Sequence, residues 1–164
     1  MNVVLIEPEI PQNTGNIART CAASTSVLHL VGPMGFSTDD RYLKRAGLDY
    51  WSQVDVRYYD SFDEVRAANP SSVFYFATTK AGKSYDEVEY GDDDFIVFGK
   101  ETKGLDEMLL KSNADRCIRI PMAEKARSLN LSNSVAVIIY EALRQNCFKA
   151  LKKEGSPGYG GENS

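Results

Sequence analysis

VVLIEPEIPQNTGNIARTCAA, residues 3–23, is the stretch from which the fold is most directly predicted. Its first four residues form an uninterrupted apolar run, which suits a short buried strand. Prolines and a glycine then mark a loop, and Asn13 or Thr14 can cap a helix that continues through Ala23. A strand, a polar loop and a helix in this order form the repeating unit of α/β proteins.

Apolar runs of strand length recur along the chain. They are Val3–Ile6, Val27–Val31, Val73–Ala77, Phe95–Phe98 and Cys117–Ile120. The runs are largely continuous and do not alternate with polar residues, which indicates strands that are covered on both faces. The predicted fold class is therefore α/β, with a mainly parallel sheet flanked by helices.

Helix signals lie between these runs. The expected helices are Arg41–Ala46 after a cap at Asp39 or Asp40, a segment that ends before Pro70, Asp106–Lys111, and Ser132–Lys153. Ser61 and Glu64 form a capping box where the second of these helices begins. The last helix contains Val135–Tyr140, which is apolar on all sides. This helix is expected to be either central in the fold or packed against a second subunit.

The length of 164 residues fits one domain. We expect this domain to cover residues 1–153, followed by a flexible tail over residues 154–164, which is rich in Gly, Ser and Pro. The apolar run at the start is too short for a signal peptide and lacks a basic flank. No stretch reaches the apolar length of a membrane span, so a cytoplasmic protein is expected.

The charge balance gives a mixed indication about nucleic acid. A formal net charge of −4 argues mildly against such a partner. Six acidic residues fall within residues 86–94, however, and this loop alone can account for the excess. Basic residues gather elsewhere, at Arg41, Lys44, Arg45, Lys80, Lys83, Lys100, Lys103, Arg116, Arg119, Lys125 and Arg127. Any one such cluster is more often a solvated face than a binding site.

Cysteine and histidine argue against metal and hydrolytic sites. Cys21, Cys117 and Cys147 are widely spaced and form no C-x-x-C pair, so buried reduced thiols are expected. His29 is the single histidine, and it lies within the apolar run Val27–Val31. An imidazole packed in a strand is the better interpretation there. No metal is therefore expected.

Three loops that follow strands are rich in Gly, Pro, Asn and hydroxyl residues. They are Glu7–Arg19, Phe98–Leu105, and Ile120–Met122 together with Arg127–Asn133. Each alone could be an ordinary turn with a helix cap. The carboxyl ends of parallel strands meet at one edge of a sheet, where ligands bind in open α/β folds. Three such loops at that edge favour a site.

Two nucleotide-binding patterns can be compared with the sequence. No G-x-G-x-x-G is present, which gives a dinucleotide fold no support. Residues 77–84 end in G-K-S and resemble a phosphate-binding P-loop. The first glycine of that motif is missing and an acidic segment follows, so an ATPase is a poor alternative.

The loop sequences resemble the three motifs of SPOUT-class RNA methyltransferases. The matching segments are NTGNIAR (13–19), FGKETKGL (98–105), IPM (120–122) and RSLNLSNSVA (127–136). The opening EPEIPQNTGN (7–16) and the spacing are similar specifically to the small tRNA wobble-nucleotide 2'-O-methyltransferases, as are residues 33–36 and 45–50. The resemblance extends from residue 2 to about residue 148. Residues 123–126 depart from it, which could shift tRNA preference but not the reaction.

The resemblance implies a fold, a cofactor and a set of site residues. It implies a C-terminal trefoil knot, a homodimer, and S-adenosylmethionine held in the knot mostly by backbone groups. The implied cofactor-binding positions are Ala77, Thr78, Gly99, Ile120, Met122 and Ser128. The implied catalytic and substrate-orienting positions are Arg19, Asn13, Glu101, Asn130 and Tyr140.

The chemistry of methyl transfer suggests how these residue types would act. A ribose hydroxyl attacks well only if its developing negative charge is stabilised, and the Arg19 guanidinium can do this although it cannot serve as a base. Glu101 is expected to orient Arg19 or a neighbouring loop. Gly99 and Gly104 permit a close approach of the backbone to the adenosine.

The predicted function is methylation, dependent on S-adenosylmethionine, of the ribose 2'-hydroxyl of the tRNA wobble nucleotide. The expected target is nucleotide 34, a cytidine or a modified uridine, in the anticodon stem-loop of leucine-type tRNAs. Three alternatives stay open at this point. They are another RNA target, a catalytically silent RNA-binding module, and an enzyme that binds a small nucleotide.

Overall fold

The computed structural model describes residues 1–36 and 51–155. The strands are β1 (Asn2–Ile6), β2 (Val27–Val31), β3 (Val56–Tyr59), β4 (Phe74–Ala77), β5 (Lys83–Ser84), β6 (Phe95–Phe98) and β7 (Cys117–Arg119). The α-helices are α1 (Pro11–Ser24), α3 (Phe62–Ala68), α4 (Glu107–Ser112) and α5 (Leu131–Gln145), and Ala114–Arg116 forms one 3-10 turn. The helix expected over residues 41–46 and the tail after residue 155 lie outside the described residues.

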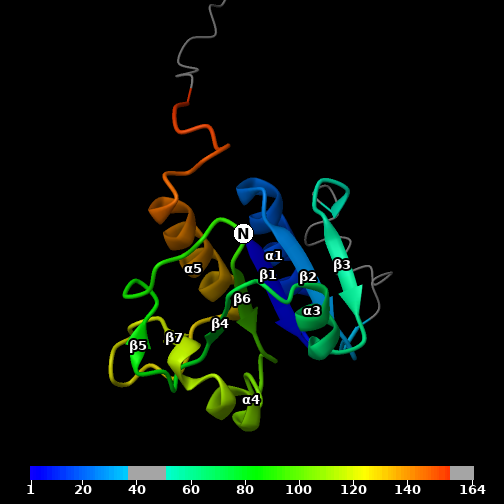
Figure 1. Cartoon of the computed structure of the whole chain (residues 1–164), viewed down its shortest axis with the longest axis vertical. Helices are drawn as coiled ribbons and strands as arrows, with labels where there is room; N and C mark the ends of the chain where they lie inside the picture. Colours follow the sequence, from blue (N-terminus) through cyan, green and yellow to red (C-terminus); the bar gives the residue numbers. More distant parts are fainter. Residues whose placement is uncertain (37–50, 156–164) are drawn as a thin grey trace, which may run out of the picture.

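One sheet organises the described part of the chain, in the order β3-β2-β1-β6-β4-β7-β5, and every pairing in it is parallel. The predicted α/β class with a parallel sheet is confirmed. Strand β6 lies between β1 and β4, so the strand order reverses around it (Figure 1). The carboxyl ends of strands beside such a reversal are the usual position of a ligand site.

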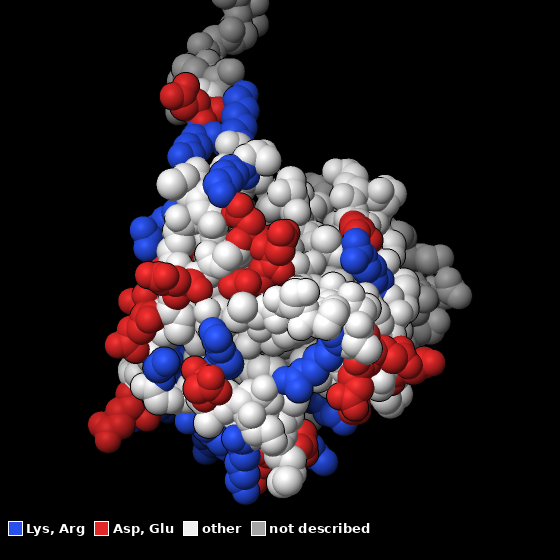
Figure 2. All heavy atoms as spheres, viewed as in Figure 1, with Lys and Arg blue, Asp and Glu red and all other residues white. Residues whose placement is uncertain are grey.

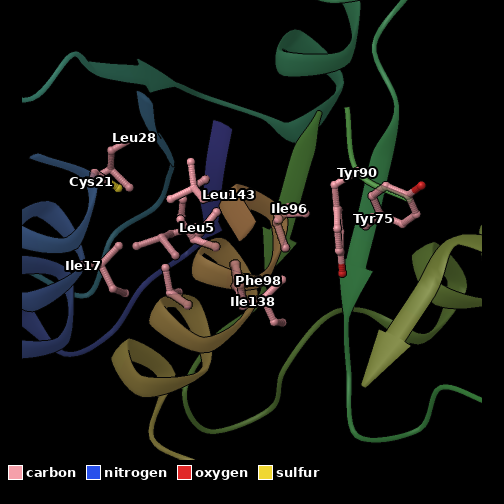
Figure 3. Close-up of a cluster of buried hydrophobic side chains, with 14 of the residues drawn as sticks. Leu5, Ile17, Cys21, Leu28, Tyr75, Tyr90, Ile96, Phe98, Ile138 and Leu143 are labelled. Carbon is pink, nitrogen blue, oxygen red and sulfur yellow. The ribbon is translucent and has the colours of Figure 1, made fainter. Parts of the chain in front are cut away.

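Helices cover both faces of the sheet. On one face, α1 and α5 pack on each other and on the side chains of Val3 and Leu5. Figure 3 shows Ile17 of α1 and Ile138 of α5 within this cluster. On the other face, Val65 of α3 packs with Val4, the neighbour of those β1 residues. Because successive strand residues point to opposite faces, this two-sided cover explains the continuous apolar runs.

Two strands escaped the sequence prediction. Strand β3 is an edge strand whose central residues Arg57 and Tyr58 are exposed, so it has no continuous apolar run. Strand β5 is two polar residues long, Lys83–Ser84, at the opposite edge. The G-K-S segment thus ends in an edge strand paired with β7, and no phosphate-binding turn leads into a helix there. The P-loop alternative is wrong.

Helix ends account for the other differences. The prediction that the last helix reaches Lys153 is wrong, because α5 ends at Gln145. Just beyond it, Cys147, Phe148 and Ala150 adopt positive φ angles of 58°, 53° and 62°, which a continuing right-handed helix cannot contain. The capping box predicted at Ser61 and Glu64 is confirmed in one of its two hydrogen bonds, since the Glu64 carboxylate accepts from the amide of Asp60 and not from that of Ser61. Ser61 Oγ accepts a hydrogen bond from the amide of Glu64, and α3 ends before Pro70.

Candidate functional site

A pocket of about 480 Å³ opens at the carboxyl ends of β4, β6 and β7. Each of the six positions expected to bind the cofactor lines it, namely Ala77, Thr78, Gly99, Ile120, Met122 and Ser128. Its inner wall includes apolar side chains such as Leu105, Ile118 and Ile138. A concave pocket of this size, with an apolar wall and polar groups at its margin, is typical of a small-molecule site.

The loop of residues 99–104 is folded tightly on itself beside the pocket. A Cβ atom on Gly99 would lie 2.2 Å from the carbonyl carbon of Gly104, so no side chain fits at this position. Gly104 has a φ of +70°, in the region that favours glycine, and its amide donates to the Lys100 carbonyl at 2.8 Å. The space beside Gly99 is thus filled by the protein backbone. A glycine is required here for that reason, and not for the expected close approach of adenosine.

Glu101 connects this loop to the start of α1. Its carboxylate accepts hydrogen bonds from the amides of Glu9 (2.8 Å) and Ile10 (3.2 Å) and from Nδ2 of Asn13 (3.1 Å). Helix α1 has no side-chain cap of its own at Ile10 and no acidic residue in its first turn. A carboxylate at a helix N-terminus satisfies amide donors and complements the helix dipole. Glu101 therefore caps α1 from a distant part of the chain.

Asn13 and Asn130 join α1 to α5. Nδ2 of Asn130 donates to Oδ1 of Asn13 at 2.9 Å, while Oδ1 of Asn130 accepts from the amide of Ser132 at 2.9 Å and from its hydroxyl at 2.6 Å. Asn130 is thus the N-cap of α5. The expectation that Asn13 or Thr14 caps α1 is wrong, because α1 begins at Pro11 and the Asn13 side chain bonds to the other two loops instead.

These bonds bring the three predicted loops together through Asn13, Glu101 and Asn130, all of which line the pocket. Arg19 and Tyr140 are not among the lining residues. Both are exposed, Arg19 on α1 and Tyr140 on α5 with 44% of its surface accessible. The structure thus assembles three of the five expected catalytic positions at the pocket and leaves two on the adjoining helices.

Sequence reasoning missed residues that hold the same loops together. The Glu9 carboxylate accepts hydrogen bonds from the amide and the hydroxyl of Thr102, and these bonds lower the pKa of Glu9. Lys100 forms an ion pair with Glu7, which raises the pKa of Lys100. Two carboxylates flanking Pro8 in a loop after a strand were a signal, but their partners lie more than ninety positions away.

Charge around the pocket is mixed. Lys80, Lys100 and Lys103 line it, and Lys80 also forms an ion pair with Glu107 at 2.8 Å. On the face shown in Figure 2, small clusters of acidic side chains are interspersed with basic ones. In the segment 86–94, Asp92 pairs with Lys149 at 2.6 Å. Basic side chains thus lie at the pocket despite the net negative charge of the chain, but Lys80 and Lys100 are each paired with a carboxylate.

His29 and two of the three cysteines are structural, as predicted. His29 is fully buried in β2, with its ring nitrogens 3.2 Å from the Tyr59 hydroxyl and 3.1 Å from Oδ1 of Asn2. Burial lowers the pKa of His29 to about 4. Cys21 and Cys117 are buried, and burial raises the pKa of Cys21 to about 12.

Cys147 is exposed, so the expectation of buried thiols is wrong there. It lies where α5 has ended and the chain turns away with positive φ.

Within residues 1–36 and 51–155, no three His, Cys, Asp or Glu side chains gather in a way that could hold a metal ion. Over the same residues, every helix is too short or too polar to cross a membrane.

Comparisons with known proteins agree with one another. The model of the SpoU rRNA methylase family matches residues 1–140. A protein of Escherichia coli (strain K12), named tRNA (cytidine(34)-2'-O)-methyltransferase, is 48% identical over 147 residues, which are 88% of this chain and 93% of the relative. A solved structure described as "Structural insights into the 2-OH methylation of C/U34 on tRNA" is 42% identical, with a TM-score of 0.85, and the match covers 89% of this chain and 95% of that one.

A more distant structure was solved with its cofactor. The SpoU methyltransferase AviRb from Streptomyces viridochromogenes, in complex with AdoMet, is 26% identical, with a TM-score of 0.79. That match covers 90% of this chain and 60% of AviRb.

Proposed function

Because this chain belongs to the SpoU rRNA methylase family, we propose that it transfers a methyl group from S-adenosylmethionine to the ribose 2'-hydroxyl of tRNA nucleotide 34. The target nucleotide is a cytidine or a modified uridine, the wobble position of leucine-type tRNAs. The observation that carries the proposal is the convergence of three separate loops on one pocket through Asn13, Glu101 and Asn130. The anticodon stem-loop is the part of the substrate that the enzyme binds, and the cytoplasm is where it acts.

The pocket fits S-adenosylmethionine. Its volume of about 480 Å³ suits a nucleoside-sized ligand, and its lining combines apolar side chains with backbone of the loops after β4, β6 and β7. Ala77, Thr78, Gly99, Ile120, Met122 and Ser128 would hold the cofactor, which supplies an electrophilic methyl group on a sulfonium when bound. The chain supplies orientation, since an in-line displacement gains much of its rate from positioning.

The roles of the polar residues follow from their contacts. Both oxygens of Glu101 already accept hydrogen bonds, so Glu101 orients the α1 loop, and a phosphate of the tRNA accepts the proton of the hydroxyl. Asn13 and Asn130 fix α1 against α5 beside the pocket. Arg19, farther along α1, stabilises the negative charge that develops on the ribose oxygen.

The proposal includes a homodimer. Val137 and Tyr140 are three residues apart on α5 and so lie on one face of the helix, with 37% and 44% of their surfaces accessible. Arg19 is exposed on α1, which packs against α5. A second copy that covers this face would bury the two apolar side chains. Residues of that copy would also lie near Arg19.

The proposal also includes a trefoil knot in the C-terminal part. Strand β7 lies beyond β4, yet α5 returns to pack on α1 and on β6. Residues 120–130 make this return beside the compact loop 99–104, and both segments line the same pocket. Stretching single molecules from both ends tests the knot, because a tightened knot leaves the chain short of its contour length. Full extension would contradict it.

Two measurements test the function. Isothermal titration with S-adenosylmethionine and with ATP should show binding of the first alone. Incubation with S-adenosylmethionine and tRNA, followed by nucleoside mass spectrometry, should yield a 2'-O-methylated cytidine or uridine derivative. Binding of ATP alone would favour an unrelated nucleotide enzyme, and methylation of ribosomal RNA in place of tRNA would refute the assigned substrate.

A further inference from the structure

The loops at residues 7–13 and 100–102 are joined by two carboxylates, one from each loop, and each accepts hydrogen bonds from the other loop. Glu101 accepts hydrogen bonds from the amides of Glu9 and Ile10. In return, Glu9 accepts from the amide of Thr102 at 3.0 Å and from its hydroxyl at 2.8 and 3.0 Å. Neighbouring residues of each loop thus bind neighbouring residues of the other in both directions. The motif resemblance implies a role for Glu101 but names none for Glu9 or Thr102.

We propose that Glu9 and Thr102 are positioning residues for methyl transfer, and that their bond fixes the start of α1 against the wall of the cofactor pocket. The proposal rests on the function proposed above. Thr102 lines the pocket, and Glu9 lies two residues before the first residue of α1. A shift of this helix would move Asn13 and Arg19 relative to the cofactor.

Loop 99–104 is stabilised by contacts within itself, whereas the start of α1 also depends on the other loop. Loop 99–104 is held by the bond from the Gly104 amide to the Lys100 carbonyl and by the contact of Gly99 with Gly104. The start of α1 has no side-chain cap within its own segment and depends on the other loop. Loss of the bond between Glu9 and Thr102 would therefore loosen the helix start and leave the pocket wall in place.

Glu9 is in the right chemical state for this role. The donors of Thr102 lower its pKa, with smaller contributions from the nearby charges of Lys100 and Lys103, so Glu9 is a carboxylate at neutral pH. Both of its oxygens accept from Thr102. The adjacent ion pair between Lys100 and Glu7 joins the same two loops.

Substitutions at Thr102 test the proposal. Thr102→Val keeps the shape of the side chain and removes the hydroxyl donor to Glu9 while the amide donor remains, whereas Thr102→Ser keeps both donors. We expect Thr102→Val to lower kcat by about tenfold to a hundredfold, because small displacements of positioned groups have effects of this size. Titration should show the Kd for S-adenosylmethionine changed less than twofold, and Thr102→Ser should restore kcat.

A double variant tests whether the two residues act through each other. Glu9→Gln combined with Thr102→Val should lose no more activity than the worse single variant. Glu64→Gln is the matched control, because Glu64 also accepts from a backbone amide, that of Asp60 at 3.1 Å, but lies at α3. It should keep the wild-type kcat. Additive losses, or an unchanged kcat in Thr102→Val, would overturn the proposal.

Hydrogen exchange separates this proposal from the function on which it rests. In Thr102→Val, the amides of residues 12–14 in the first turn of α1 should exchange faster than in the wild type, with α5 unchanged. This readout needs no RNA, so it holds even if the wild-type protein fails to methylate nucleotide 34. If the amides at the start of α1 exchange as slowly in Thr102→Val as in the wild type, the positioning role is contradicted.

Discussion

At the scale of single residues, Asn13 shows how far a motif can be interpreted. The sequence marked it both as a helix cap and as a site residue. The first is wrong, because its side chain bonds to Glu101 and Asn130 at the pocket; its part in catalysis stays a prediction. Local patterns specify bonds between near neighbours, such as that of Ser61 with Glu64. The bond between Glu9 and Thr102 spans 93 positions, so no local pattern could have predicted it.

Arg19 carries the most direct prediction about catalysis. In the proposed mechanism Arg19 stabilises the developing oxyanion, so Arg19→Ala removes that positive charge, and we expect kcat to fall by about a hundredfold to a thousandfold. Arg19 is outside the pocket lining, so the Kd for S-adenosylmethionine should not change. Single-turnover kinetics and titration measure the two quantities. Equal loss of binding and turnover would assign Arg19 to folding or cofactor binding.

His29 predicts a pH dependence of stability. Its pKa is about 4 in the folded protein, mainly because burial disfavours the charged ring, and about 6.5 in the unfolded chain. A folded-state pKa below the unfolded value means that the stabilising contribution is present above pH 6.5 and is lost as the pH falls toward 4. Urea unfolding of wild type and His29→Gln across this range should show the steeper loss in wild type. Parallel curves would contradict the prediction.

At the scale of elements, burial on both faces made the strands predictable. β2 and β6 have the expected bounds, and β1, β4 and β7 differ from prediction by one residue at one end. Elements that lack this burial were missed, as β3 and β5 show. The end of α5 was also missed, because its apolar pattern continues past Gln145 while the backbone turns to positive φ.

The tight packing of loop 99–104 predicts a large effect of adding one side-chain methyl group at Gly99. Gly99→Ala places a Cβ within 2.2 Å of the Gly104 backbone, so the loop must open. We expect a loss of stability above about 3 kcal/mol, in the range of the largest single-residue effects, together with loss of cofactor binding. Gly82→Ala is the control, because its Cβ would meet nothing within 4 Å. Thermal unfolding of both variants measures the difference, and equal melting temperatures would contradict the prediction.

At the scale of the whole molecule, the parallel pairing of the strands was predicted from the sequence, whereas their order was not. The proposed knot rests on family resemblance. Threading depends on the path of residues 120–130 past loop 99–104, and apolar periodicity contains no information about such a path. The surroundings of α5 were also not determined by the sequence. Val135–Tyr140 left open whether the helix was central or covered by a partner, and the structure has both a buried and an exposed apolar side.

The proposed homodimer gives a prediction for the exposed face of α5. Val137→Glu together with Tyr140→Glu places two charges on the exposed side of α5, and we expect the protein to become monomeric and inactive without unfolding. Light scattering with size-exclusion chromatography measures the mass, and circular dichroism confirms the fold. A double variant at Tyr58 and Met108, which are exposed apolar residues on other elements, should stay dimeric. A monomeric and active wild type would contradict the dimer.

The central claim is that one pocket directs a methyl group to one sugar oxygen. Methylation of a leucine tRNA can be mapped by nuclease digestion and mass spectrometry, beside an otherwise identical tRNA that has a 2'-deoxynucleotide at position 34. The account predicts one added methyl on the ribose of nucleotide 34 in the first tRNA and none in the second. Methyl transfer to the deoxy substrate, or to any other nucleotide of the first, would contradict it.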